Sequence, residues 1–167
     1  IWFANKTTLY VADEGDGVNT TANALNPNAG LQKWSLVGGT WQLDYTLQNG
    51  LGLGVQYTVA GLDPSLSPAT DGLRNLTGKV NHDGTVTLFA ITSTISTSGD
   101  QGADPNRLVS ITDSLAAKSL PNNEQFHVLE TARFGEVLRG VALNPCGGED
   151  GDAKDGANCS PDGYDGD

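Results

Sequence analysis

The feature that most constrains the fold of this 167-residue chain is a repeated strand. Residues 72–80 read GLRNLTGKV and residues 137–145 read VLRGVALNP, so Arg139 follows Arg74 after sixty-five residues. Between the two copies lie three β-rich segments separated by polar turns, at residues 85–93, 107–113 and 126–132. The order is therefore four strands followed by a new first strand.

The first part of the chain has the same order. After the letters IWFA, which we interpret as the end of a first strand, β-rich segments cover residues 7–15, 31–37 and 40–47. The GG pair at 38–39 predicts a two-residue hairpin. Units of four antiparallel strands that repeat every roughly 40 to 70 residues are typical of β-propeller blades. A β-sandwich is the alternative, because it also uses short strands and turns, but the ordered repeat favours the propeller.

Five stretches carry a resemblance to a known group of proteins. TLYVADEG, GLQKWSLVGGTWQLDYTL, GLRNLTG, NRLVSITD and LRGVALNP resemble the later blades of secreted β-propeller proteins of bacteria and algae. The resemblance covers residues 1–145 and implies an all-β partial propeller of about two four-stranded antiparallel blades plus one strand. It implies no catalytic residues. Rings usually need four or more blades, so the expected partners are the remaining blades of the same propeller or other copies of the chain.

The charge divides the chain into two parts. Residues 1–145 hold 13 acidic and 8 basic side chains, a net −5, whereas residues 146–167 hold 7 acidic side chains and one Lys, a net −6. We therefore expect a blade domain over 1–145 and an acidic, Gly/Asp-rich tail or connector over 146–167. The acidic total of −11 argues against nucleic acid as a partner. No apolar run reaches the length of a membrane-spanning helix, and the absence of Met suggests a processed or longer parent protein.

Cysteines and glycosylation motifs indicate an oxidising compartment. Cys146 and Cys159 bracket twelve polar residues, and a disulfide between them would close a small acidic knob, contributing about 3 kcal/mol. The motif Asn-Xaa-Ser/Thr occurs four times, at Asn5, Asn19, Asn75 and Asn158. We expect Asn19, in a long polar loop, to be the best glycan acceptor and Asn75, on an inner strand, the worst. These features favour an extracellular or cell-surface glycoprotein.

Two acidic segments are candidates for Ca²⁺, the one cofactor that the sequence suggests, because oxygen-rich loops bind this cation. One follows a predicted strand and holds Asp13, Glu14 and Asp16; the other is the tail, with Asp150, Asp152 and Asp155. The alternatives are a solvated turn for the first and a disordered acidic linker for the second.

Other chemistry is scarce. His82 lies in a predicted turn and His127 in a predicted strand, without metal-spaced partners, and no nucleophile turn or phosphate loop occurs. The repeated Arg74 and Arg139 could line a central channel and hold an anion, but an arginine repeated in each blade favours a structural role, bonding loop carbonyls or pairing with an acid of the neighbouring blade. The three tryptophans could stack on sugars, although packing is the more typical role in strands; they are Trp2, Trp34 and Trp41.

The sequence therefore favours a non-catalytic extracellular glycoprotein, a structural propeller module for assembly or adhesion. Two alternatives stay open. A Ca²⁺-dependent propeller hydrolase, similar to lactonases or phytases, needs acids or histidines that converge at one end of the channel. A glycan-binding lectin needs exposed aromatic platforms.

Overall fold

The computed structural model describes residues 1–18, 27–95 and 104–144. This part of the chain is all-β, with eight strands and a single turn of 3₁₀ helix. The elements are β1 Trp2–Asn5, β2 Thr8–Asp13, β3 Gly30–Val37, β4 Thr40–Leu47, η1 Pro64–Leu66, β5 Ala69–Val80, β6 Thr85–Ile95, β7 Arg107–Ser114 and β8 His127–Thr131. The six β-rich segments, the first copy of the repeat at residues 72–80 and the IWFA strand predicted from the sequence are all confirmed.

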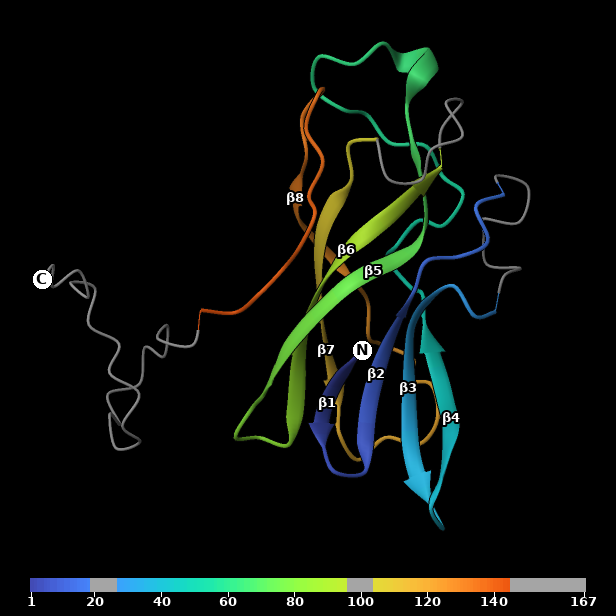
Figure 1. The fold of residues 1–167 in the computed structure, drawn as a ribbon, viewed down its shortest axis with the longest axis vertical. Helices are drawn as coiled ribbons and strands as arrows, with labels where there is room; N and C mark the ends of the chain where they lie inside the picture. The colour runs from blue at the N-terminus through green and yellow to red at the C-terminus, as the bar shows by residue number, and fades with distance from the viewer. Residues whose placement is uncertain (19–26, 96–103, 145–167) are drawn as a thin grey trace, which may run out of the picture.

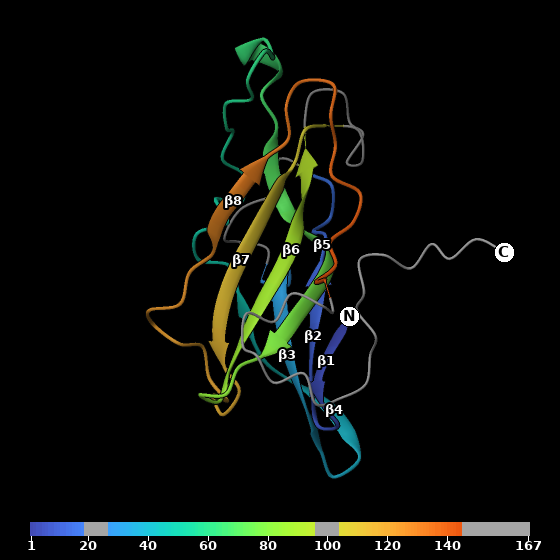
Figure 2. The ribbon, with the colours of Figure 1, turned by 90° about the vertical axis from the view of Figure 1, so that its left-hand side faces the viewer.

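The strands form two four-stranded antiparallel sheets, each in chain order, β1–β2–β3–β4 and β5–β6–β7–β8 (Figure 1). Seen from the side, the sheets lie one behind the other, with β5–β8 nearer the viewer (Figure 2). Strand β5 contacts β1, β2 and β3, so the first strand of the second sheet packs across the face of the first sheet. Within the described residues, no helix has the length and apolar character needed to cross a membrane.

Glycines set the tight connections and the close approach of the sheets. Gly38 and Gly39 have φ values of 57° and 83° and join β3 to β4, which confirms the predicted two-residue hairpin. Between the sheets, a Cβ on Gly72 would lie 2.3 Å from the backbone oxygen of Asp13. Only glycine therefore allows β5 to approach the end of β2 this closely.

A continuous apolar core fills the space between the sheets. Alternate residues of each strand point to opposite faces, and the facing sides bring together buried Leu31 and Leu47 of the first sheet with Leu88 and Ile111 of the second. Trp2 of β1 packs against the ring of Tyr10, with ring centroids 6.2 Å apart.

The predicted ninth strand is not formed. Residues 137–144, the described part of the second copy of the repeat, are not assigned to a strand. Backbone groups of this segment hydrogen-bond to side chains: the Leu138 backbone NH donates to Oδ1 of Asn106, and the carbonyls of Leu138 and Arg139 accept from Asn106 and Asn75. A strand requires a backbone ladder, and here two asparagine side chains hold the segment beside the second sheet (Figure 2).

The long connection between β4 and β5 was not predicted in detail. Isolated bridges join Leu53 to Thr70 and Gln56 to Ala69. Arg107 of β7 anchors the connection: its guanidinium lies 4.0 Å from the ring centroid of Tyr57 and donates to the Leu51 carbonyl. The predicted acidic tail lies outside the described residues.

Candidate functional site

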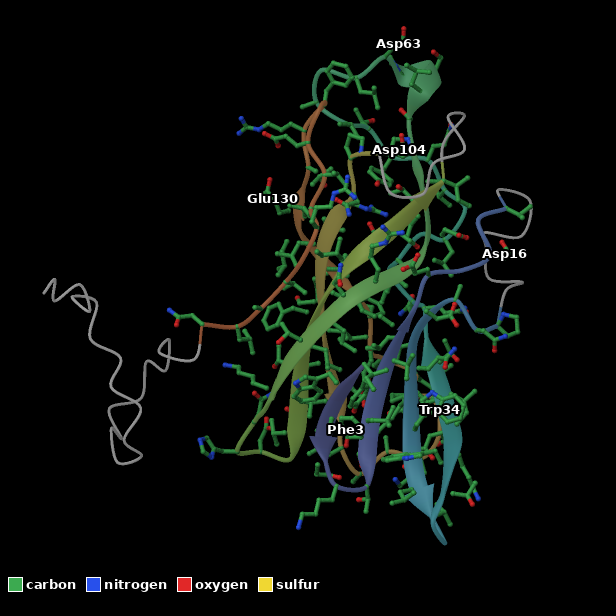
Figure 3. All side chains as sticks on the ribbon, viewed as in Figure 1. Phe3, Asp16, Trp34, Asp63, Asp104 and Glu130 are labelled. Carbon is green, nitrogen blue, oxygen red and sulfur yellow. The ribbon has the colours of Figure 1, made fainter. Side chains whose placement is uncertain are left out.

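The acidic loop after β2 is occupied by internal bonds. Asp13 accepts from the Gly15 backbone NH through Oδ1 and from the Gln32 side chain through Oδ2. Glu14 forms an ion pair of 2.8 Å with Arg74. The described ranges contain no cluster of three or more His, Cys, Asp or Glu side chains arranged for a metal, and the acidic groups labelled in Figure 3 lie far apart on the molecule. The tail candidates Asp150, Asp152 and Asp155 lie outside these ranges.

The two repeated arginines do not perform one shared role. Arg74 pairs with Glu14 of the neighbouring sheet, which fits the structural interpretation of the repeat. Arg139 contributes its backbone carbonyl, which accepts from the Asn75 side chain.

The predicted glycan and disulfide sites are described only in part. Asn5 is the exposed last residue of β1, and its Oδ1 accepts from the Thr7 NH and hydroxyl. We expected the strand of Asn75 to be covered, but this residue is exposed. The reason is that it lies at a β-bulge, with φ 47°. Its side-chain nitrogen, where a glycan would attach, donates to Arg139. Outside the described residues lie Asn19, Asn158, Cys146 and Cys159.

A buried polar cluster that was not predicted from the sequence lies between the two sheets. Lys33 of β3 and Asp113 of β7 form an ion pair of 3.0 Å, and both side chains are fully buried. Lys33 also donates to the Tyr45 hydroxyl at 3.0 Å and to the Ser114 carbonyl at 2.5 Å. Tyr10 and Tyr45 each donate their hydroxyl proton to Asp113. Three strands of the first sheet therefore converge on one carboxylate of the second.

The electrostatics of this cluster favour attachment of the sheets over catalysis. Burial, followed by the hydrogen bonds to Asp113, raises the pKa of both Tyr10 and Tyr45 far above the usual tyrosine value. Both hydroxyls therefore stay protonated as donors. Because Lys33 and Asp113 are fully buried and bonded to each other, neither can reach a substrate.

Glu124 connects this cluster to a surface cleft. Its Oε1 accepts from the Ser114 backbone NH, and its other oxygen, Oε2, is buried without a hydrogen-bond partner. Burial, followed by the interaction with the nearby carboxyl of Asp113, raises the pKa of Glu124 to about 7. The cleft has a volume of about 500 Å³ and lies between the end of β4 and the β7–β8 loop, lined by Thr46, Leu47, Gln48, Asn49, Leu120, Pro121, Asn122 and Glu124. It presents no aromatic platform for a sugar.

A second feature is the face of β1–β4 turned away from β5–β8. Because Tyr10 and Lys33 point toward the second sheet, their neighbours along the strands point away from it. We call this surface the aromatic face; its residues are Phe3, Leu9, Trp34, Trp41 and Leu43. Phe3 and Trp41 make an edge-to-face contact with centroids 6.0 Å apart, and Phe3 is 54% exposed. Figure 3 labels Phe3 and Trp34 on this sheet.

A sequence signal for the buried cluster did exist. Lys33 lies between Leu31 and Ser35 at positions that share one face of a strand, and a charged side chain at an inward position indicates a buried partner. Asp113 continues the inward series of Val109 and Ile111. The sequence alone could not pair the two charges, because their contact depends on how the sheets are stacked.

The chain matches no protein-family model, no curated protein and no solved structure.

Proposed function

We propose that the two sheets are successive blades of a β-propeller and that the chain is a non-catalytic, extracellular module for assembly or adhesion. The observation that carries the proposal is that the segment following each position of the repeat, strand β5 in one case and the extended residues 137–144 in the other, packs on the preceding sheet. Strand β5 crosses β1, β2 and β3, and residues 138 and 139 lie against Asn106 and Asn75 of the second sheet. Sheets that follow each other in chain order and pack face to face are typical of a propeller.

The proposal of a non-catalytic protein is supported by the way in which the buried polar groups are bonded. Lys33 and Asp113 between the sheets are bonded to each other, and large apolar side chains such as Phe3 and Leu43 are exposed on the aromatic face. Large exposed apolar surfaces usually mark interaction sites. An extracellular location is supported by the exposed glycosylation motif at Asn5 and by the chemistry of the tail cysteines.

The test of non-catalytic function is an assay with lactones and phytate in the presence of Ca²⁺. We expect no turnover, and no heat of Ca²⁺ binding by calorimetry. Turnover that is abolished by Glu124→Gln, in a variant that remains folded, would contradict the proposal and favour the hydrolase alternative.

The test of the extracellular assignment is secretion of the chain from a eukaryotic host. We expect the intact mass to decrease on treatment with a glycosidase, and Asn5→Gln to remove one glycan. A secreted protein that carries no glycan on any motif would count against this part of the proposal.

A further inference from the structure

The chain carries two sheet faces that no other described segment covers in full. One is the aromatic face of β1–β4. The other is the side of β5–β8 turned away from β1–β4, which we call the threonine face; it is formed by Thr77, Lys79, Thr87, Phe89, Ser110, Thr112 and His127. These residues share one side because Phe89 pairs with Thr77 and Ser110, while Thr87 pairs with Thr112.

Strand register makes the two sheets repeats of each other. Leu9 pairs with Trp34 in the first sheet, and Leu88 pairs with Ile111 in the second. In the first sheet this pair points away from the second sheet, and in the second sheet the pair points toward the first sheet. Leu88 and Ile111 are buried to 1% and 2% exposure by the first sheet; on the aromatic face Leu9 is 8% exposed, but the surrounding Phe3 and Leu43 are 54% and 42% exposed. The aromatic face is therefore the counterpart of a face that is buried in the second sheet.

The charges of the internal interface also have counterparts. When the two sheets are aligned by these pairs, Ser110 of β7 corresponds to Lys33 of β3, and Leu36 of β3 corresponds to Asp113 of β7. Both members of the buried ion pair are thus replaced by uncharged residues, one on each uncovered face. A contact between these two faces therefore places no unpaired charge at either of these two positions, where a lone buried charge would destabilise it strongly.

We infer that a second copy of this chain docks head to tail, its aromatic face on the threonine face of the first copy. The inference rests on the proposed blade arrangement and names its partner. The chain has a net charge of −11, so two copies repel each other overall, and the cation of Lys79 on the threonine face reduces that repulsion where this face meets an acidic second copy. Two to four copies would supply roughly the four to eight blades of a closed ring.

The test is the mass of the purified chain in solution, measured by light scattering and native mass spectrometry over a range of concentrations. We expect a discrete oligomer of two to four chains. Phe3→Asp on the aromatic face and Thr112→Glu on the threonine face should each give monomers. Leu120→Asp, at an equally exposed apolar position in the cleft, is the matched control and should leave the oligomer intact.

Mixing the two monomeric variants identifies the mode of docking. Each variant keeps one intact face, so an equimolar mixture should form a one-to-one dimer. A mixture that stays monomeric, or a Thr112→Glu chain that associates like the unmodified one, would overturn head-to-tail docking. A monomeric unmodified chain at all concentrations would overturn the second copy as partner, but not the blade proposal, because the other blades could belong to a different polypeptide.

Discussion

Lys33 in β3 and Asp113 in β7 form a fully buried ion pair of 3.0 Å that joins the two sheets. Burying two charges costs free energy of desolvation, which the pair recovers only with good geometry and additional hydrogen bonds. Tyr10, Tyr45 and the Ser114 carbonyl supply those bonds. The cluster therefore fixes the position of one sheet on the other as well as contributing to stability.

Replacing Lys33 by Met should lower the free energy of unfolding by about 3–5 kcal/mol, because Asp113 would remain buried without its cation. Denaturant unfolding measures this change. The control is Lys118→Met, which removes an exposed lysine that pairs with Asp44 at 3.7 Å and donates to the Ser35 hydroxyl; because this lysine is solvated, the loss should be smaller, about 1 kcal/mol. In the double variant Lys33→Met/Asp113→Leu, much of the lost stability should return, and a loss equal to the sum of the single losses would contradict a coupled pair.

Tyr10→Phe should destabilise the protein by about 1.5–3 kcal/mol, the usual value for a hydrogen bond to a charged group. The ring contact with Trp2 is kept, so the change isolates the hydroxyl. Tyr57→Phe is the control, since it removes a bond of 2.7 Å to the neutral carbonyl of Pro105 and should cost about 1 kcal/mol. Equal losses of stability for the two variants would show that the hydrogen bond to the Asp113 carboxylate stabilises the protein no more than a bond to a neutral carbonyl.

Stability should depend on pH through Glu124. Its pKa is raised from 4.5 to about 7 in the folded protein, first by burial and then by the nearby carboxyl of Asp113. The folded state therefore binds the proton more tightly than the unfolded state, and this contribution is fully present below the unfolded value and lost as the pH rises to about 7. Glu124→Gln should remove this part of the pH dependence. A parallel pH profile for the variant and the unmodified protein, from melting curves, would contradict the assignment.

Gly72→Ala tests the approach of β5 to β2. The added Cβ would lie 2.3 Å from the Asp13 backbone oxygen and 2.5 Å from the Glu14 carbonyl carbon. Backbone atoms cannot yield as a flexible side chain can, so we expect a loss of about 1–3 kcal/mol or more. Gly140→Ala is the control, because no atom lies within 4 Å of its added Cβ. A Gly72→Ala chain as stable as this control would mean that the sheets are not packed this closely.

The sequence predicted the strands well because strand and turn signals are local. The GG pair at 38–39 and the alternation over residues 85–93 are each read within a few residues of the chain. The partners of Lys33 could not be read in this way, since Asp113 belongs to another sheet and the contact depends on stacking. Residues 137–144 failed as a strand for a related reason: their pattern is strand-like, but no described strand offers them a backbone ladder.

The blade assignment is tested most directly by NMR measurement of contacts to residues 137–144, on the Phe3→Asp chain so that association does not intervene. A propeller predicts nuclear Overhauser contacts from Arg139 to the Asn75 side chain and from Leu138 to the Asn106 side chain, as for a first strand crossing the preceding blade. Backbone contacts from this segment to β4 or β8, the outer strands of the two sheets, would instead make it an added edge strand of a β-sandwich and would contradict the account.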